Sequence, residues 1–328
     1  MISVLKKLVN ATGISGREAQ VRDLIKEEIT PYVDDVETDA MGNLIAHKKG
    51  NGKKLLFAAH TDSIGFFVTF IEKNGAIRVS PVGDIDFLAF SYSEVVSENG
   101  VKGVVVSEKD GEIPKADSVY IDIGAKSEKQ AKSKVRVGDF FVPAPRMTKL
   151  LSNEYAGHSF DGKVGCAILI EAIKQIKETK NDLYFVFTAQ QEVYSRGARV
   201  AAYSVRPDVA LAVDTTDAKD KSSVSDGNAV LGEGVSIKIK TSRMIYSPEV
   251  VEKLREISTR HSIKYQCEVA NSGTEGDAKA LQNGAMGCLV GAISVPCANI
   301  HTSSEIIDIK DVQEALKLVL KIAEEYEI

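Results

Sequence analysis

The stretch Lys53-Lys-Leu-Leu-Phe-Ala-Ala59, which leads directly into His60-Thr-Asp62, decides the fold. Its apolar run has the length of a strand that is buried on both faces. Two later runs, Leu183-Tyr-Phe-Val-Phe-Thr188 and Val209-Ala-Leu-Ala-Val213, have the same form and alternate with helical patterns. Continuous apolar strands between helices are typical of a sheet that is covered on both sides. The sequence therefore predicts an α/β fold, a mixed sheet with helices on both faces.

A different pattern fills the segment from residue 66 to residue 155. Short strands with period-two alternation occur at Ala76–Ser80, Val101–Val106 and Ser118–Asp122, and within this segment only Ser127–Lys134 looks helical. This pattern favours a small β-barrel or sandwich. We expect residues 1–65 and 156–328 to form one α/β domain, and residues 66–155 to form an inserted small β-barrel domain.

The composition excludes several classes of protein. A chain of 328 residues with 44% hydrophobic and 27% charged residues is typical of a globular protein. Its net charge of -5 offers no basic face for nucleic acid. No apolar stretch has membrane-spanning length, and the first residues lack a signal-peptide pattern, so we expect a cytoplasmic protein. The four cysteines have no close pair spacing, so we expect them to be reduced.

Residues with the chemistry of metal ligands follow or flank the predicted strands and helices. In α/β sheets, ligands gather at the carboxyl ends of the strands. Three strands deliver a histidine or a carboxylate to that edge, a fourth candidate lies just before the helix that starts at Val164, and a fifth follows a turn near Pro296. These candidates are His60, Asp161, Glu192, Asp214 and His301. One carboxylate that bridges two cations, with one histidine and one carboxylate for each cation, would use all five.

Each candidate also has an ordinary structural interpretation. A histidine at a strand end is commonly a surface or hydrogen-bonded residue, an aspartate there is common in turns, and a glutamate after a strand often caps the next helix. Asp62 lies two residues beyond His60, which is the spacing that lets a carboxylate accept the second ring N–H of a ligating histidine. Gln191 lies beside Glu192, where a hydrolytic site would need a proton-accepting carboxylate.

A set of motifs in the same order resembles the dinuclear metallo-aminopeptidases of the glutamyl and tetrahedral type, some of which carry an endoglucanase label. The resemblance covers nearly the whole chain. It rests on Ala11-Thr-Gly-Ile-Ser-Gly-Arg-Glu18, Asp39-Ala-Met-Gly-Asn-Leu44, Ala59-His-Thr-Asp-Ser-Ile-Gly-Phe66, Ser159-Phe-Asp-Gly-Lys-Val-Gly-Cys166, Gln191-Glu-Val-Tyr-Ser-Arg-Gly-Ala198, Ala212-Val-Asp-Thr-Thr216, Gly273-Thr-Glu275 and Ile300-His-Thr-Ser-Ser-Glu305.

This resemblance implies a role for each residue of the candidate site. Asp161 would bridge two divalent cations, zinc or cobalt with manganese as a third option. His60 and Asp214 would complete the shell of one cation, and Glu192 and His301 that of the other. Asp62 would orient His60. The inserted segment would be a dimerisation domain, and the chain would assemble into a homo-oligomer, with dimers forming a dodecamer.

The departures from the family pattern are concentrated in the site motifs. Gln191 stands where the family has its general base, and a Gln side chain can hold a water molecule but cannot take its proton. Gly162 replaces a second Asp, Ser63 replaces a Glu, and Tyr194-Ser195 replaces Gly-Leu.

Two functions from different classes therefore stay open. The first is a metal-dependent hydrolase that removes N-terminal residues from a peptide substrate, with Gln191 and Asp62 as residues of the catalytic machinery. The second is a metal-binding pseudoenzyme that binds peptides or assembles with an active paralogue. A glycosidase would need two carboxylic acids beside a sugar bond, and placing the carboxylates on cations leaves no such pair.

Overall fold

The computed structural model describes residues 1–108, 113–219, 229–270, 276–284 and 286–326. The Gly273-Thr-Glu275 motif therefore lies outside the described residues. None of the helices in the described ranges is both long and apolar enough to cross a membrane. All four cysteines are free thiols, and Cys166 is buried as expected for a core residue.

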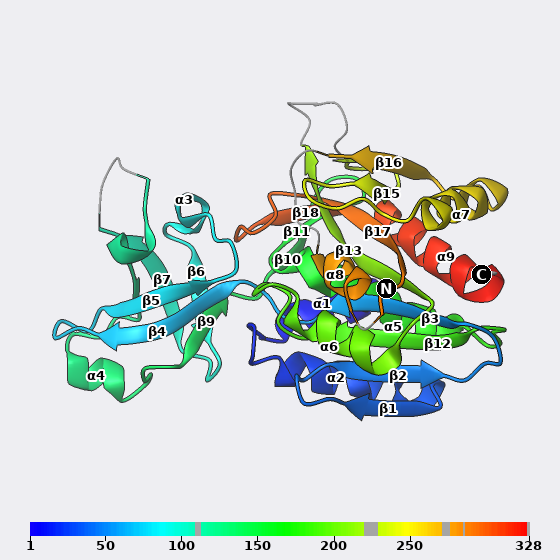
Figure 1. Cartoon of the computed structure of the whole chain (residues 1–328). Helices are drawn as coiled ribbons and strands as arrows, with labels where there is room; N and C mark the ends of the chain where they lie inside the picture. Colours follow the sequence, from blue (N-terminus) through cyan, green and yellow to red (C-terminus); the bar gives the residue numbers. More distant parts are fainter. Residues whose placement is uncertain (109–112, 220–228, 271–275, 285, 327–328) are drawn as a thin grey trace.

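The described chain forms a large sheet with helices and a separate β-barrel (Figure 1). The α-helices are α1 (Ile2–Asn10), α2 (Ala19–Ile29), α3 (Phe87–Phe90), α4 (Glu128–Lys132), α5 (Phe160–Gln175), α6 (Arg196–Val205), α7 (Pro248–Arg260), α8 (Gly276–Gln282) and α9 (Ile309–Glu325). The strands of the large sheet are β1 (Asp35–Thr38), β2 (Leu44–Lys48), β3 (Lys54–His60), β10 (Met147–Lys149), β11 (Glu154–Gly157), β12 (Asp182–Thr188), β13 (Val209–Lys219), β14 (Ala229–Val230), β15 (Val235–Lys240), β16 (Tyr265–Val269), β17 (Leu289–Ala298) and β18 (Glu305–Asp308). The barrel strands are β4 (Gly65–Ile71), β5 (Ile77–Val82), β6 (Glu94–Ser97), β7 (Lys102–Ser107), β8 (Val119–Asp122) and β9 (Phe140–Pro143).

The centre of the large sheet is parallel. Its strand order is β1-β2-β12-β3-β13-β17-β18-β11-β10, and the pairs β12·β3, β3·β13 and β13·β17 run parallel. The outer pairs β1·β2, β17·β18, β18·β11 and β11·β10 are antiparallel. The sheet is therefore mixed, as the sequence predicts, and the carboxyl ends of its four central strands meet at one edge.

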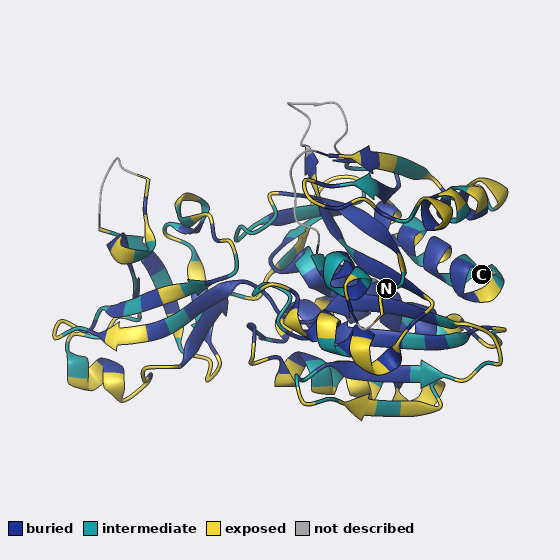
Figure 2. Ribbon diagram, viewed as in Figure 1, coloured by how far each residue is buried: buried dark blue, intermediate teal, exposed yellow. Residues whose placement is uncertain are grey.

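Helices cover both faces of this sheet. Helix α5 lies against β3 and β13 on one face, with α1, α2 and α9 packed on it, while α6 and α8 cover the other face (Figure 1). Every residue of β3 after Lys54 is buried, and Figure 2 shows the central strands as a buried layer between helices with exposed outer sides. Burial on both faces is the reason why these strands are continuously apolar.

The part of the inserted segment that ends at Pro143 forms a closed barrel with the strand order β4-β5-β8-β7-β6-β9, and all its pairs are antiparallel. Strands β10 and β11, which follow, pair in the large sheet instead. The barrel has a hydrophobic core of its own, which includes Phe66, Val105 and Ile121. A smaller hydrophobic cluster joins the barrel to the rest of the chain, because Ile14 packs with Phe140 and Val142 and with the half-buried Val193. The α/β fold with a small barrel is thus confirmed.

Two local expectations were wrong. Helix α3 is a second helix in the barrel segment, and its N-cap Asp86 accepts hydrogen bonds from the amides of Leu88 and Ala89. Strand β13 does not end before Asp214 but continues to Lys219, because it keeps pairing with β17. Pro296 lies inside β17, and the turn expected near it includes Ile300 and His301, directly after the end of that strand.

Candidate metal centre

The central strands bring the candidate ligands to one place. His60 is the last residue of β3, Glu192 lies in the loop after β12, and Asp214 lies in β13. Asp161 is in the first turn of α5, and His301 follows β17. Because β12, β3, β13 and β17 are parallel neighbours, residues at or beyond their carboxyl ends converge.

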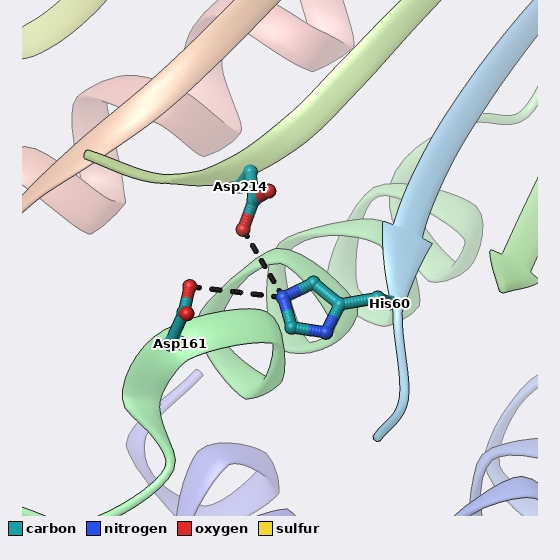
Figure 3. Close-up of side chains that lie close together, drawn as sticks. All are labelled: His60, Asp161 and Asp214. Carbon is teal, nitrogen blue, oxygen red and sulfur yellow. Dashed lines mark ion pairs between the residues drawn. The ribbon is translucent and has the colours of Figure 1, made fainter. Parts of the chain in front are cut away.

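The five side chains form two sets of possible metal ligands that share Asp161. One set is His60, Asp161 and Asp214, and the other is Asp161, Glu192 and His301; within each set the ligand atoms lie within 4.8 Å of one another. His60 Nε2 is 3.4 Å from Asp214 Oδ1 and 3.7 Å from Asp161 Oδ1 (Figure 3). His301 Nε2 is 3.1 Å from Asp161 Oδ2 and 3.6 Å from Glu192 Oε2. The structure therefore brings all five candidates together, with each oxygen of Asp161 facing a different histidine.

Asp161 is held in this position by its neighbours rather than by regular helix geometry. Asp161 and Gly162 have non-helical backbone angles, and Gly162 has φ +77°. The buried carboxylate of Glu305 accepts hydrogen bonds from the amides of Phe160 (2.5 Å), Asp161 (3.2 Å) and His301 (3.2 Å). One carboxylate thus fixes the backbones of two candidate ligands.

Two glycines leave room for the side chains of two candidate ligands, His60 and Glu192. A Cβ on Gly162 would lie 2.6 Å from His60 Cε1 and 2.7 Å from each ring nitrogen, so the His60 ring packs directly on this glycine. Gly83 follows β5 of the barrel, and a Cβ there would lie 2.9 Å from Glu192 Oε2 and 2.5 Å from Ile64 Cγ2. The barrel therefore forms one wall of the site.

The site is short of positive charge. Burial raises the pKa of Glu192 to about 8, and the charge of Asp161 raises it as well. Burial lowers the pKa of His301, but Asp161 and Glu192 outweigh this effect and raise it to about 10. Burial also opposes protonation of His60, yet Asp214 and Asp161 raise its pKa well above the ordinary value. The negative charge of the buried carboxylates thus favours the protonated form of both imidazoles. A bound cation would neutralise the same negative charge.

Asp62 holds the loop after β12 more firmly than it holds His60. Its Oδ1 accepts a hydrogen bond from the amide of Gln191 and its Oδ2 one from the amide of Glu192, both at 3.0 Å. Ser15 Oγ donates to the same carboxylate at 2.6 Å. His60 Nδ1 lies 3.5 Å from Asp62 Oδ1 without hydrogen-bond geometry. Asp62 thus lies beside the His60 ring without a hydrogen bond to it, whereas its two oxygens fix the backbone amides of Gln191 and Glu192.

A cavity of about 500 Å³ opens beside the second ligand set. Its wall includes Gln191, Glu192 and His301, together with Tyr194, which is 93% exposed. A cavity of this size suits a small ligand or a peptide end. Gln191 therefore borders the space in which a substrate would meet the candidate ligands.

Sequence reasoning missed several residues that support this site. Glu305 and Ser15 are both inside motifs quoted above, but their motifs gave no sign of which partner they hold. Thr215 Oγ1 donates to Asp161 Oδ1 at 2.5 Å, and its position directly after Asp214 was the available signal. Contacts of this kind depend on the three-dimensional packing and are not visible in spacing.

Comparison with known proteins gives a consistent result. The sequence profile of the M42 glutamyl aminopeptidase family matches residues 42–318. The lysyl aminopeptidase of Pyrococcus furiosus is 31% identical over 342 aligned positions, covering 98% of this chain and 96% of that protein.

Solved structures show the same fold over the whole chain. Aminopeptidase APDkam598 from the archaeon Desulfurococcus kamchatkensis superposes with a TM-score of 0.95 at 34% identity, over 99% of this chain and 94% of that one. The Pyrococcus horikoshii TET1 peptidase, which can assemble into a tetrahedron or a large octahedral shell, superposes with a TM-score of 0.91 at 31% identity, over 99% of both chains.

Proposed function

The chain belongs to the M42 glutamyl aminopeptidase family, and from this membership we propose that it removes amino-terminal residues from peptides at a pair of divalent cations. The observation that carries the proposal is the shared position of Asp161 between two sets of donor atoms. Adjacent sets that share one carboxylate are the arrangement expected of a two-metal hydrolytic site.

The residues present fit such cations. Both ring nitrogens of His60 are buried and have no hydrogen-bond partner, although buried polar atoms are normally paired. A cation between His60 and Asp214 would give Nε2 a partner and would offset the carboxylate charge. We propose that His60, Asp214 and Asp161 hold one cation, and that Glu192, His301 and Asp161 hold the other. Imidazole and carboxylate ligands suit zinc and cobalt, and manganese is a third candidate.

Bound cations of this type polarise a carbonyl and make a water molecule acidic near neutral pH. The contribution of the chain is to place groups around that chemistry. Asp62 holds the amides of Gln191 and Glu192, and Gln191 borders the cavity. The Gln191 carboxamide can donate to or accept from a water molecule or a peptide group, but it cannot accept a proton. Turnover would therefore lack the factor of about 10²–10⁴ that a general base usually contributes.

Gln191 also favours a second candidate function, that of a metal-binding pseudoenzyme. A chain that keeps its five ligands but has Gln191 at the base position could bind peptides without cleaving them, or assemble with an active paralogue. This candidate predicts full metal binding together with negligible hydrolysis, whereas the hydrolase predicts metal binding and hydrolysis.

The experiment loads purified protein with zinc or cobalt and follows hydrolysis of aminoacyl chromogenic substrates. Wild type, His60→Ala and Gln191→Glu are compared, and the metal content is measured by mass spectrometry. We expect about two cations per chain in the wild type and turnover that His60→Ala abolishes. Turnover in Gln191→Glu alone would support the pseudoenzyme, and a protein that stays metal-free after loading would refute the ligand assignment.

We further propose that residues 66–155 form a dimerisation domain and that the chain is a homo-oligomer. The assembly of the Pyrococcus horikoshii TET1 peptidase supports this proposal. The barrel also exposes large apolar side chains, with Phe70, Leu88 and Tyr92 being 59%, 59% and 66% exposed, and apolar side chains of this size are common at protein interfaces. Light scattering or native mass measurement should find dimers or dodecamers, and a monomer at micromolar concentration would refute it.

A further inference from the structure

Three successive backbone amides at the site donate to two buried carboxylates. The amide of Gln190 donates to Glu18 Oε1 at 3.1 Å. The next two amides, those of Gln191 and Glu192, donate to Asp62 at 3.0 Å each. Glu18 is 3% exposed and Asp62 0%. Hydrogen bonds to a carboxylate are stronger than those to a neutral acceptor. The carboxylates of Glu18 and Asp62 therefore hold the backbone at the start of this loop.

The loop needs such a hold because its backbone is strained. Gln190, Tyr194 and Ser195 all have left-handed conformations, with φ of +59°, +76° and +50°. Each non-glycine residue in this region costs about 1–2 kcal/mol, so it persists only where its surroundings enforce it. The segment that carries Gln191 and Glu192 is therefore not set by local preference but by the partners of its amides.

Glu18 reaches this loop from a segment far away in the sequence. Its Oε1 also accepts the amide of Gly16 at 2.7 Å, which fixes the carboxylate relative to its own turn. In the same turn, Ser15 Oγ donates to Asp62. The segment from Ser15 to Glu18 thus supplies one of the two carboxylates that hold the loop and donates a hydrogen bond to the other, Asp62. Glu18 itself does not line the cavity beside the candidate ligands.

We propose that Glu18 is a positioning residue for the hydrolytic reaction: by holding the amide of Gln190 it fixes the adjoining Gln191, so that the Gln191 carboxamide faces the substrate cavity. This inference rests on the proposed function for its effect on turnover. Glu18 has the partners to do this, since the amides of Gly16 and Gln190 leave it no freedom to turn away. A displacement of a reacting group by about 1 Å can cost about 10²-fold in rate.

The first test compares Glu18→Ala and Glu18→Gln with the wild type in the metal-loaded protein. We expect Glu18→Ala to lower kcat by up to about 10²-fold with little change in KM. Glu18→Gln should retain most of kcat, because its carbonyl oxygen can accept the same two amides. Asp311→Ala is the matched control, since Asp311 is also buried and accepts the amides of Gly232 and Gly234. It should lower stability without a specific loss of kcat.

A double-mutant cycle separates positioning from general destabilisation. If Glu18 acts through Gln191, then Glu18→Ala should cause little further loss of kcat in a Gln191→Ala background. An equal loss in both backgrounds would overturn the proposal. Should Glu18→Ala not fold, Glu18→Asp takes its place, because its side chain is one methylene too short to keep both amides; full kcat in Glu18→Asp would also overturn it.

Amide hydrogen exchange tests the same hold without any need for activity. In Glu18→Ala the amide of Gln190 should exchange faster, while the amides of Gln191 and Glu192 stay protected by Asp62 and the bound metal stays at the wild-type amount. Unchanged exchange at Gln190 would overturn the proposal. If the wild type is inactive but the amide responds as expected, the proposed hydrolysis fails while the hold of Glu18 on the loop is supported.

Discussion

Replacing Gly162 by alanine should damage the site even though alanine adds one methyl group only. The backbone at Gly162 has φ +77°, and its added Cβ would meet three atoms of the His60 ring at 2.6–2.7 Å. His60 is 1% exposed, so its ring cannot swing into solvent to make room. The aspartate that the family resemblance implies at this position would need still more space, and restoring it should therefore harm this chain.

The expected magnitude has two parts. A left-handed backbone costs a non-glycine residue about 1–2 kcal/mol, and overpacking a filled site costs about 1–3 kcal/mol more. The Gly124→Ala variant separates the backbone cost from the overpacking cost, because Gly124 has φ +76° and a Cβ there would meet nothing within 4 Å. Gly124→Ala should therefore lose only the backbone part, about 1–2 kcal/mol of unfolding free energy. The difference between the two variants, about 1–3 kcal/mol, is the part due to His60.

Two measurements test this reasoning. Denaturant unfolding of metal-free Gly162→Ala and Gly124→Ala gives the difference in unfolding free energy. Cobalt titration followed by absorption then counts the cations, and we expect Gly162→Ala to bind the cation of the His60 set more weakly while keeping that of the His301 set. If Gly162→Ala loses no more stability than Gly124→Ala and binds both cations like the wild type, the packing of His60 on Gly162 does not constrain the site.

Three further predictions concern Glu305, the bound cations and the buried His158. Glu305→Gln should leave one of three backbone amides without a good acceptor, costing about 1–3 kcal/mol, and should weaken cation binding by about 10–100-fold, measured by unfolding and metal titration. Removal of the cations with a chelator should lower the melting temperature, since a ligand at about 1,000 times its Kd adds about 4 kcal/mol, and readdition of zinc should restore it; a melting temperature insensitive to both would contradict the metal assignment. Burial, with the charges of Lys163 and Arg146, lowers the pKa of His158 from 6.5 to about 3. The stability that neutral His158 contributes is thus present above about pH 6.5 and is lost as the pH falls toward 3, so His158→Asn should flatten the fall in melting temperature across this range, and an unchanged slope would count against it.

Much of the fold could be predicted from local pattern. The apolar run before His60 reads as a buried strand because both faces of β3 are covered, and the alternation in the inserted segment reflects a barrel with one inner face. The extension of β13 through Asp214 was not predictable, because polar residues there are sustained by pairing with β17 rather than by their own preference.

The candidate ligands could be found because each lies close to a recognisable element. The groups that hold them could not, since Glu305 reaches Asp161 across 144 positions of sequence and Glu18 reaches Gln190 across 172. The importance of Gly162 was also hidden. In the sequence, Gly162 is interpreted as a lost aspartate, whereas in the structure the His60 ring packs directly against this glycine.

The close approach of Gly83 to Glu192 connects metal affinity with subunit association, which are usually measured separately. Strand β4 starts at Gly65, shortly after His60, and the loop after β5 returns to touch Glu192, so the barrel cannot tilt without moving the surroundings of that carboxylate. If subunits associate through the barrel, binding free energies at the two places are reciprocal. A cation that favours the barrel position found in the oligomer also favours association, and association then raises the affinity for the cation by the same factor. Metal affinity should then rise with protein concentration, and a chelator should shift the oligomer toward smaller species.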